Sequence, residues 1–206
     1  MVQSTSAPNA RDRLLFAALK LVREEGYDST SVDDLCREAG VTKGAFFHHF
    51  ASKEQLAVEG TKFWTKVTGA AFLGAAYHAH ADPFDQLIGY VEFRRELLKG
   101  RSLAEFSCFL GTMVQEKYAA SPAIRDACLE GIMSHASTVE EIIAAAKAHH
   151  CPEASWSPQS LALHTQTVIQ GAFILAKATN DATTADDMIA HLKRYIELLF
   201  NKNRED

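Results

Sequence analysis

Apolar residues recur at three- and four-residue spacing along almost the whole chain, and no segment shows the apolar and polar alternation of a strand. In the first expected helix the recurring positions are Leu15, Ala18, Leu19 and Val22. This period restricts the chain to an all-α fold. With 206 residues, of which 47% are apolar, the chain can bury one core or a small domain joined to a larger one.

Start and stop signals divide this pattern into helices. Gly26 and Gly40 follow apolar stripes as C-terminal stops, and Ser121 with Pro122 supplies an N-cap and a proline at the first helical position. The expected N-caps are Ser31 or Thr30, Thr42, Ser52, Asp82 and Ser121. The expected helices cover residues 9–25, 32–39, 43–49, 53–80, 83–99, 103–119, 122–150, 158–179 and 185–202.

Composition excludes several classes of protein. Four cysteines lie apart without a CxxC pair, which argues against a disulfide framework and a structural zinc site. No apolar run approaches the roughly 20 residues of a membrane helix, and the first ten residues lack the features of a signal peptide. We therefore expect a cytoplasmic protein with no membrane partner. The net charge of -5 gives no global attraction to DNA, so any DNA binding must come from local geometry.

The stretch VTKGAFFHHFASKEQL, residues 41–56, combines a glycine, bulky aromatics and paired histidines that do not favour helix stability. Two short helices, 32–39 and 43–49, meet at a tight turn containing Gly40. This is the layout of a helix-turn-helix, whose second helix enters the major groove of DNA. Gly44 lacks a β-carbon, which allows the backbone to approach another surface closely.

The second helix of this motif has a predicted inner and outer side. Phe46 and Phe50 lie four residues apart and are expected to face the core. The outer positions then hold Lys43, Ala45, Phe47 and His48. For the paired histidines, DNA contact is favoured for His48 and partial burial for His49, with packing of both as the alternative.

Local charge sets the expected strength of binding. Lys53 stands beside the cap Ser52, where a cation and a helix N-terminus together favour a backbone phosphate. Residues 1–53 nevertheless hold seven cations and seven anions. Tight binding therefore requires two such heads acting together.

Residues 26–56, GYDSTSVDDLCREAGVTKGAFFHHFASKEQL, resemble the TetR family of transcriptional regulators. The resemblance implies a three-helix DNA-binding head, residues 1–52, and a helical ligand-binding and dimerisation body, residues 53–206. Phe47 stands where the family often has tyrosine, so a hydroxyl contact to phosphate is absent. The resemblance implies this DNA-facing set: Thr30, Thr42, Lys43, Gly44, Ala45, Phe47, His48 and Lys53.

The last two expected helices carry wide apolar stripes. One stripe holds Leu161, Thr165, Val168, Ile169, Ala172, Phe173 and Ala176, and the other holds Met188, Ile189, Leu192, Tyr195, Ile196, Leu199 and Phe200. Such stripes are compatible with an ordinary core within one chain, or with a four-helix interface between two chains that Gly171 lets approach closely. Together with the resemblance, their width favours a homodimer through these two helices.

A small-molecule inducer is the second implied partner. Its candidate contacts are Trp64, Phe72, Phe93, Phe106, Cys108, Phe109, Met113, Gln166, Gln170 and Phe173, most of which are equally compatible with a packed core. Cys108 lies in EFSCFLGTMVQE, which resembles a segment through which some family members respond to electrophiles or oxidants. No Lys, Arg or His stands close to Cys108 in sequence to activate this thiol, which argues against that role.

Other classes of function find little support in the sequence. No nucleophile elbow, phosphate loop or metalloenzyme motif is present, so we expect no enzyme and no cofactor. A metal sensor could use His78, His80, His149, His150 and Cys151, but solvated helix ends explain these residues better, and no metal site is predicted. The prediction is a regulator, most simply a repressor, released from a palindromic operator by a small molecule or an electrophile.

Overall fold

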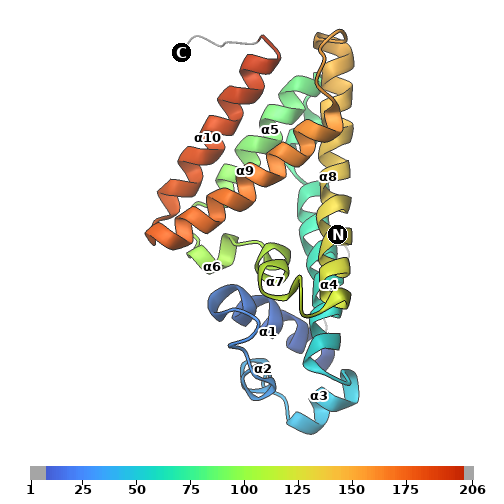
Figure 1. The fold of residues 1–206 in the computed structure, drawn as a ribbon, viewed down its shortest axis with the longest axis vertical. Helices are drawn as coiled ribbons and strands as arrows, with labels where there is room; N and C mark the ends of the chain where they lie inside the picture. Colours follow the sequence, from blue (N-terminus) through green and yellow to red (C-terminus); the bar gives the residue numbers. More distant parts are fainter. Residues whose placement is uncertain (1–7, 202–206) are drawn as a thin grey trace. The chain divides into compact units, whose positions relative to one another are not determined.

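The computed structural model describes residues 8–201, which form ten α-helices, one 3-10 helix and no β-strand (Figure 1). The predicted all-α class is confirmed. No helix in this part of the chain has the length and apolar character needed to cross a membrane. The helices are α1 (Ala10–Glu25), α2 (Val32–Ala39), α3 (Lys43–His49), α4 (Lys53–Leu73), η1 (Ala76–Ala79), α5 (Pro83–Glu96), α6 (Leu103–Phe106), α7 (Phe109–Lys117), α8 (Pro122–His150), α9 (Pro158–Thr179) and α10 (Ala182–Leu199).

The predicted limits of α2, α3, α8 and α9 agree with the structure, because local capping sets them. Ser31 and Asp34 form a capping box at the start of α2, and the hydroxyl of Thr42 accepts the backbone N–H of Ala45 at 3.2 Å. The Ser52 hydroxyl likewise accepts the backbone N–H of Gln55 at 3.0 Å. These bonds satisfy amide groups that have no partner within their helices.

Other predicted limits were wrong. The helix expected over 53–80 ends at Leu73, and the one expected over 83–99 ends at Glu96. The last helix begins at Ala182, since the Asp181 carboxylate accepts the backbone N–H of Thr183 at 2.9 Å. It ends at Leu199, whereas the predicted end at Lys202 lies outside the described residues.

The helix expected over 103–119 is also interrupted. Ser107 has extended backbone angles and a buried side chain whose hydroxyl donates to the carbonyl of Leu103. This bond ends α6 after four residues. Cys108 follows, and α7 begins at Phe109.

The chain divides into two compact units. The head unit comprises residues up to Lys66 together with Phe109–Gly131, and the body unit comprises Val67–Cys108 and the residues from Ile132 onward. Helices α4 and α8 each contribute residues to both units. The predicted functional boundary between residues 52 and 53 is a separate question and stays a prediction.

The head unit is built around α1, which contacts α2, α3 and α7. Its amphipathic pattern places one face of α1 inside while charged residues take the other face. The buried side chains of this core are Leu14, Leu15, Ala17, Ala18, Leu21, Leu35, Cys36, Ala39, Phe46, Phe50 and Leu56.

A carboxylate on α7 holds the loop between α1 and α2. Glu116 accepts the backbone N–H of Tyr27 at 3.0 Å and that of Asp28 at 2.9 Å. Gly26 adopts φ +92°, and a β-carbon there would lie 2.7 Å from a Glu116 oxygen. Only glycine fits both this conformation and this close approach. The contact explains why α7 belongs to the head unit although it lies far along the chain.

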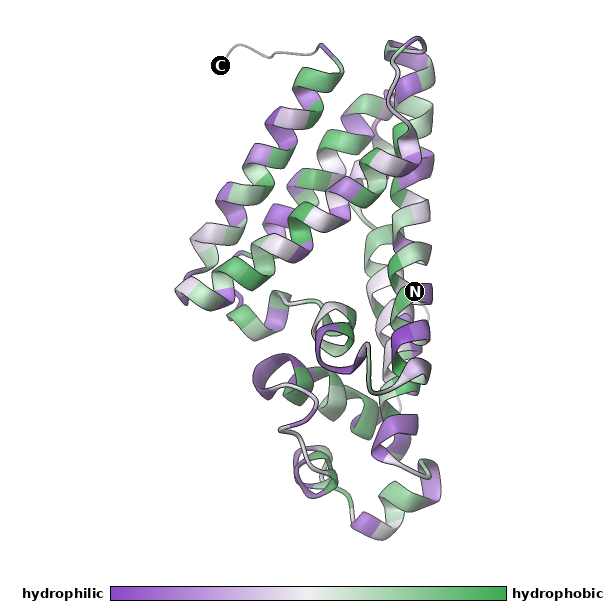
Figure 2. Ribbon diagram, viewed as in Figure 1, coloured by the Kyte–Doolittle hydropathy of each residue, from purple (hydrophilic) through white to green (hydrophobic). Residues whose placement is uncertain are grey.

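The body unit has its core among η1, α5, α6, α9, α10 and the body-unit parts of α4 and α8, with α9 and α10 side by side (Figure 1). Hydrophobic residues are distributed along both α9 and α10 and are interrupted by hydrophilic ones (Figure 2). The largest fully buried side chains of this unit include Tyr90, Leu87 and Ile143. Most of the two predicted apolar stripes on α9 and α10 belongs to this core.

Candidate DNA interface and ligand site

The turn between α2 and α3 has a defined geometry. Gly40 lies in the left-handed region at φ 61°, and its N–H donates to the carbonyl of Arg37 at 3.3 Å. The N–H of Val41 donates to the carbonyl of Cys36 at 3.0 Å. This pair of bonds is a Schellman motif, which ends α2 and turns the chain directly into α3.

Two phenylalanines orient α3. Phe46 and Phe50 are 0% and 1% exposed, and their ring centroids lie 5.9 Å apart. Because both rings are buried against α1 and α2, the opposite side of α3 faces solvent. The helix-turn-helix layout predicted from the sequence is therefore present.

The solvent side of α3 carries most of the predicted DNA-facing residues. Thr42, Lys43, Gly44, Phe47 and His48 are exposed, whereas Ala45 and His49 are half-buried. Phe47 is 52% exposed, which is unusual for a phenyl ring and leaves it available to a partner. A β-carbon at Gly44 would meet only the Thr42 hydroxyl, at 3.8 Å.

The cations near α3 are held in exposed ion pairs. Lys43 Nζ lies 3.0 Å from Asp33 Oδ1, with 58% and 68% of the two side chains exposed. Arg37 pairs with Asp34 on the same helix. Such exposed pairs contribute little to stability, so each cation can exchange its partner for a phosphate. The acidic neighbours also reduce the net positive charge of this surface.

Two members of the predicted DNA-facing set have structural roles instead. Thr30 is 1% exposed, and its hydroxyl donates to the carbonyl of Gly26 at 2.7 Å. The expectation that its side chain faces DNA is therefore wrong. Lys53 Nζ donates to the carbonyls of Tyr27 and Thr30, both at 2.9 Å, and lies 4.0 Å from the centre of the Tyr27 ring.

These contacts change the interpretation of Lys53. Burial lowers the pKa of its ammonium group, which has exchanged water for carbonyl oxygens and an aromatic face. The ammonium thus holds the loop between α1 and α2, where a free phosphate contact was predicted. Sequence reasoning missed this role because the acceptors are backbone atoms 26 and 23 residues away.

The body unit contains a polar cluster enclosed by aromatic rings. The Tyr90 hydroxyl lies 3.0 Å from His135 Nε2, 3.0 Å from Arg94 Nε and 3.2 Å from Gln166 Nε2. Arg94 also approaches His135 Nε2 at 2.6 Å. Phe72 packs on this cluster, with its ring 4.4 Å from the guanidinium carbon of Arg94. We call Tyr90, Arg94, His135 and Gln166 the polar cluster.

The charge of the polar cluster is unbalanced. Burial, with Arg94 nearby, lowers the pKa of His135 to about 3, so this imidazole is neutral at pH 7. No acidic side chain among residues 8–201 forms an ion pair with Arg94. The adjacent Arg95 differs, since Asp186 accepts two of its N–H groups at 2.8 and 2.9 Å. The half-buried guanidinium of Arg94 therefore has no acidic partner in the part of the chain that the structure describes.

The predicted inducer contacts are divided between the two units. Phe72, Phe93 and Gln166 lie in the body unit at the polar cluster, where Phe72 and Phe93 form a T-shaped pair at 5.3 Å. Phe106 and Phe173 pair separately at 5.5 Å, and Gln170 is half-buried on α9. The three predicted contacts in the head unit are Trp64, Phe109 and Met113.

Cys108 is half-buried at the break between α6 and α7 and packs against the body core. A sensing role for its thiol stays a prediction. Sequence reasoning missed Arg94, Tyr90 and His135, although an aromatic residue and an arginine four positions apart on one helix, Tyr90 and Arg94, were a usable signal.

A helix-turn-helix whose second helix is exposed, in a chain with a separate helical body, defines a DNA-binding regulator of transcription. A family model described as bacterial regulatory proteins, tetR family, matches residues 14–59. A second, described as tetracyclin repressor-like, C-terminal domain, matches residues 83–192, which is more than half of the chain. The chain belongs to the TetR family, and it is a transcriptional regulator rather than an enzyme.

Individual relatives agree with this assignment. The HTH-type transcriptional regulator LmrA of Bacillus subtilis is 26% identical over 183 residues, covering 85% of this chain and 90% of LmrA. The regulator AcrR of Shigella flexneri is 26% identical over 199 residues, covering 94% and 88%. The regulatory protein TetR of Rhodobacter sphaeroides has the same fold, with a TM-score of 0.81 at 22% identity over 90% of this chain and 98% of that one. Ligand-responsive repression is typical of the family.

The role of Lys53 can be tested by comparison with Lys43. Lys53→Met removes the donor from two backbone carbonyls, so it should lower the free energy of unfolding by about 1 to 3 kcal/mol. Lys43→Met removes only an exposed ion pair and should change it by less than about 0.5 kcal/mol. Urea unfolding of the two variants beside the wild type measures both effects. Equal stability of all three proteins would contradict the structural role of Lys53.

Proposed function

We propose that this chain is a homodimeric repressor that binds a palindromic operator through α3 and is released by a small molecule bound in its body unit. The observation that carries this proposal is the exposed side of α3, where Lys43, Phe47 and His48 face solvent because Phe46 and Phe50 do not. The decisive experiment is selection of an operator from random DNA, followed by a screen for compounds that release it. A cytoplasmic location is part of this proposal.

The exposed residues of α3 suit two kinds of DNA contact. Lys43 can exchange Asp33 for a phosphate or a guanine edge, and His48 can donate to a base while neutral. Phe47 offers an apolar surface to a thymine methyl group or a sugar. The open space around Gly44 supports close approach of the backbone to DNA.

We propose that the dimer interface lies on the outer side of α9 and α10 and not on the two apolar stripes predicted from the sequence. Phe173 and Leu192, which were expected at the interface, are 7% and 2% exposed within a single chain. A charge at either position would disrupt the body core, so those substitutions cannot report on dimerisation. Most residues of the two stripes are buried within a single chain, so the width of the stripes does not by itself indicate a dimer.

Several apolar residues on α9 and α10 remain uncovered. They are Leu163, Ile174, Leu175, Tyr195 and Leu198, with exposed fractions between 38% and 58%. We call this set the outer face. A β-carbon at Gly171 would meet nothing within 4 Å, so another helix can approach there. Apolar residues gathered on neighbouring helices in this way favour a self-complementary contact with a second chain.

For the inducer, we infer a ligand that carries both a negative charge and an apolar body. The guanidinium of Arg94 has no acidic partner among residues 8–201, and it lies against the rings of Phe72 and Tyr90, with Phe93 packed on Phe72. A carboxylate would form a charge-assisted pair with this arginine, and an aromatic or aliphatic body would pack on the rings. Organic acids are therefore the preferred class, and an electrophile acting at Cys108 is the second candidate.

Continuous segments of the chain connect the body unit, where the ligand is proposed to bind, to the head unit, which contains α3. Helices α4 and α8 contain residues of both units, and α7 follows α6 after the break at Ser107 and Cys108. In a dimer, two recognition helices must reach successive major grooves about 34 Å apart. A ligand that favours another separation of the heads lowers operator affinity, since only one of the two then fits its half-site.

A substitution at Gly44 tests DNA binding separately from folding. Gly44→Leu should fold with unchanged or slightly higher thermal stability, since its β-carbon would meet only the Thr42 hydroxyl, at an ordinary contact distance of 3.8 Å, and glycine weakens a helix. It should lose operator binding, because the side chain fills the space that DNA must enter. Fluorescence anisotropy with labelled operator, beside thermal unfolding, measures both. Gly69→Leu, at another helical glycine with nothing within 4 Å, is the matched control and should bind normally. Tight operator binding by Gly44→Leu would refute this docking.

Charged substitutions on the outer face test the proposed dimer interface. The double variant Ile174→Glu and Leu198→Glu should shift the protein from dimer to monomer, because it places two carboxylates in an apolar contact. Light scattering after size-exclusion chromatography measures the mass, and circular dichroism checks that the helices persist. Leu73→Glu, at a leucine of the body unit that is 76% exposed, is the control and should stay dimeric. A monomeric wild type, or a double variant that stays dimeric, would exclude this interface.

The inducer class can be tested with charge-matched compounds. Aromatic and fatty carboxylic acids should raise the melting temperature and release the operator, whereas their primary amides should act at least about tenfold more weakly. Arg94→Gln should remove this preference for the acid, while Arg95→Gln, which loses an arginine that already has an acidic partner, should keep it. Equal responses to acids and amides in the wild type would rule out Arg94 as an anion site.

A further inference from the structure

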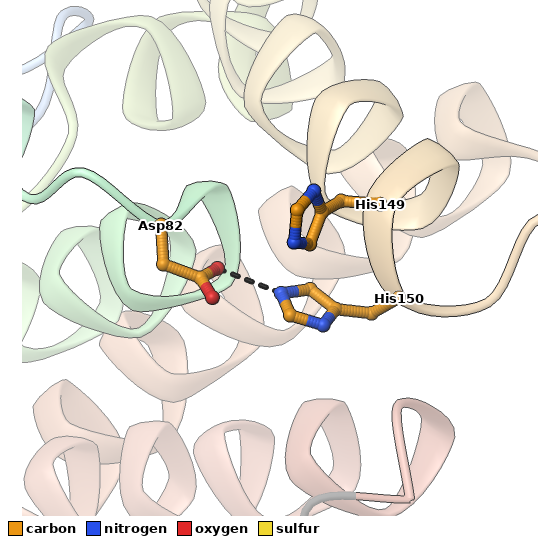
Figure 3. Close-up of side chains that lie close together, drawn as sticks. All are labelled: Asp82, His149 and His150. Carbon is orange, nitrogen blue, oxygen red and sulfur yellow. Dashed lines mark hydrogen bonds and ion pairs between the residues drawn. The ribbon is translucent and has the colours of Figure 1, made fainter.

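Two histidines at the end of α8 and an aspartate before α5 form a cluster in the body unit (Figure 3). Asp82, His149 and His150 each offer one donor atom, and these atoms all lie within 4.8 Å of one another. The sequence predicts that the two histidines are part of a solvated helix end. It gives no sign of the aspartate beside them, because Asp82 stands 68 residues before His150. The fold adds the carboxylate that the sequence pattern did not place there.

Two of the three donors are already held in position. His150 Nε2 lies 2.7 Å from Asp82 Oδ1, and the same oxygen accepts the backbone N–H of Phe84 at 2.7 Å. The His150 ring packs edge-on against the Phe84 ring at 5.9 Å, and only 12% of the His150 side chain is exposed. Little conformational freedom is therefore lost when these two groups bind an ion.

The third donor is freer to adjust. His149 is exposed, and its ring lies 4.5 Å from that of His150 at an angle of 70° (Figure 3). Both histidines stand on the last turn of a 29-residue helix, where the terminal carbonyl groups favour a positive charge. Rotation of the His149 side chain alone can bring its nitrogen closer to the other two donors.

We propose that Asp82, His149 and His150 bind one divalent transition-metal ion, with Zn²⁺ as the best match. Two imidazole nitrogens and one carboxylate oxygen are ligands that Zn²⁺ prefers, at about 2.0 to 2.2 Å from the ion. The ion takes the place of the hydrogen bond between Asp82 and His150 and draws His149 inward. A water molecule completes a tetrahedral set, so the ion binds reversibly. It links the start of α5 to the end of α8.

Cys151, the next residue, is not a ligand in this proposal. Its side chain is half-buried and packs against the body core, and its sulfur does not belong to the group of clustered donor atoms. The donor set is therefore the aspartate and the two histidines.

Competition with a chromophoric chelator tests the proposal in untagged full-length protein. The wild type should bind one Zn²⁺ per chain, and His149→Ala should bind it at least about tenfold more weakly. Asp82→Asn should do the same, because asparagine keeps the helix cap but not the charge. His191→Ala removes an exposed histidine of α10 and should leave the affinity unchanged.

A second measurement separates ligand loss from damage to the fold. Zn²⁺ should raise the melting temperature of the wild type and of His191→Ala but not that of His149→Ala, whose melting temperature without metal should equal that of the wild type. X-ray absorption should show two imidazoles around the ion. Binding only at millimolar Zn²⁺, or equal affinity in His149→Ala, would overturn the proposal. Neither measurement involves DNA, so failure here leaves the operator model untouched.

Discussion

Burial of Phe46 and Phe50 is the interaction on which the DNA-facing surface depends. Helix α3 has only seven residues, too few to be stable alone, so packing must hold it. Burying each phenyl ring contributes about 1.5 to 3 kcal/mol. The same two rings fix the rotation of the helix about its own axis, since turning either outward would expose it. The outward positions of Lys43 and His48 follow from this packing.

A second constraint acts on the loop that leads into α2. Glu116 accepts two backbone N–H groups of this loop, while Lys53 donates to two of its carbonyls. The loop thus depends on α7 and on the first turn of α4, and neither is adjacent to it in sequence. Because α7 begins one residue after Cys108, a rearrangement at the break between α6 and α7 has a short covalent route to the start of the helix-turn-helix. This supports release of DNA through the position of α2 as well as through the separation of the heads.

The parts of the structure that the sequence predicted are those set by neighbours within about four residues. Caps at Thr42 and Ser52, the stop at Gly40 and the spacing of Phe46 and Phe50 were sufficient to predict the helix-turn-helix. The contacts that the sequence did not reveal join residues far apart in the chain. Lys53 bonds to carbonyls more than 20 residues away, and Tyr90 meets Gln166 across 76 residues. The inference of a dimer interface from the apolar stripes of α9 and α10 was unreliable for a related reason. Periodicity gives the width of a stripe, but it does not show whether the same chain or a second chain covers it.

The charge balance of the head bears on how such a regulator can be switched. Seven cations face seven anions in residues 1–53, and Lys43, Arg37 and Lys20 each lie in an ion pair. Phosphate attraction to one head is therefore weak, since the cations are balanced by anions and these three must leave an acidic partner to reach DNA. A dimer overcomes this because the second head binds at high effective concentration, a gain on the order of 10² to 10⁴. That gain disappears when the heads no longer match the spacing of the grooves. A strongly basic head would hold DNA even when the two heads do not match the spacing of the grooves. A head with nearly zero net charge makes the affinity for DNA depend on the separation of the two heads. That separation is the quantity that a ligand in the body can change.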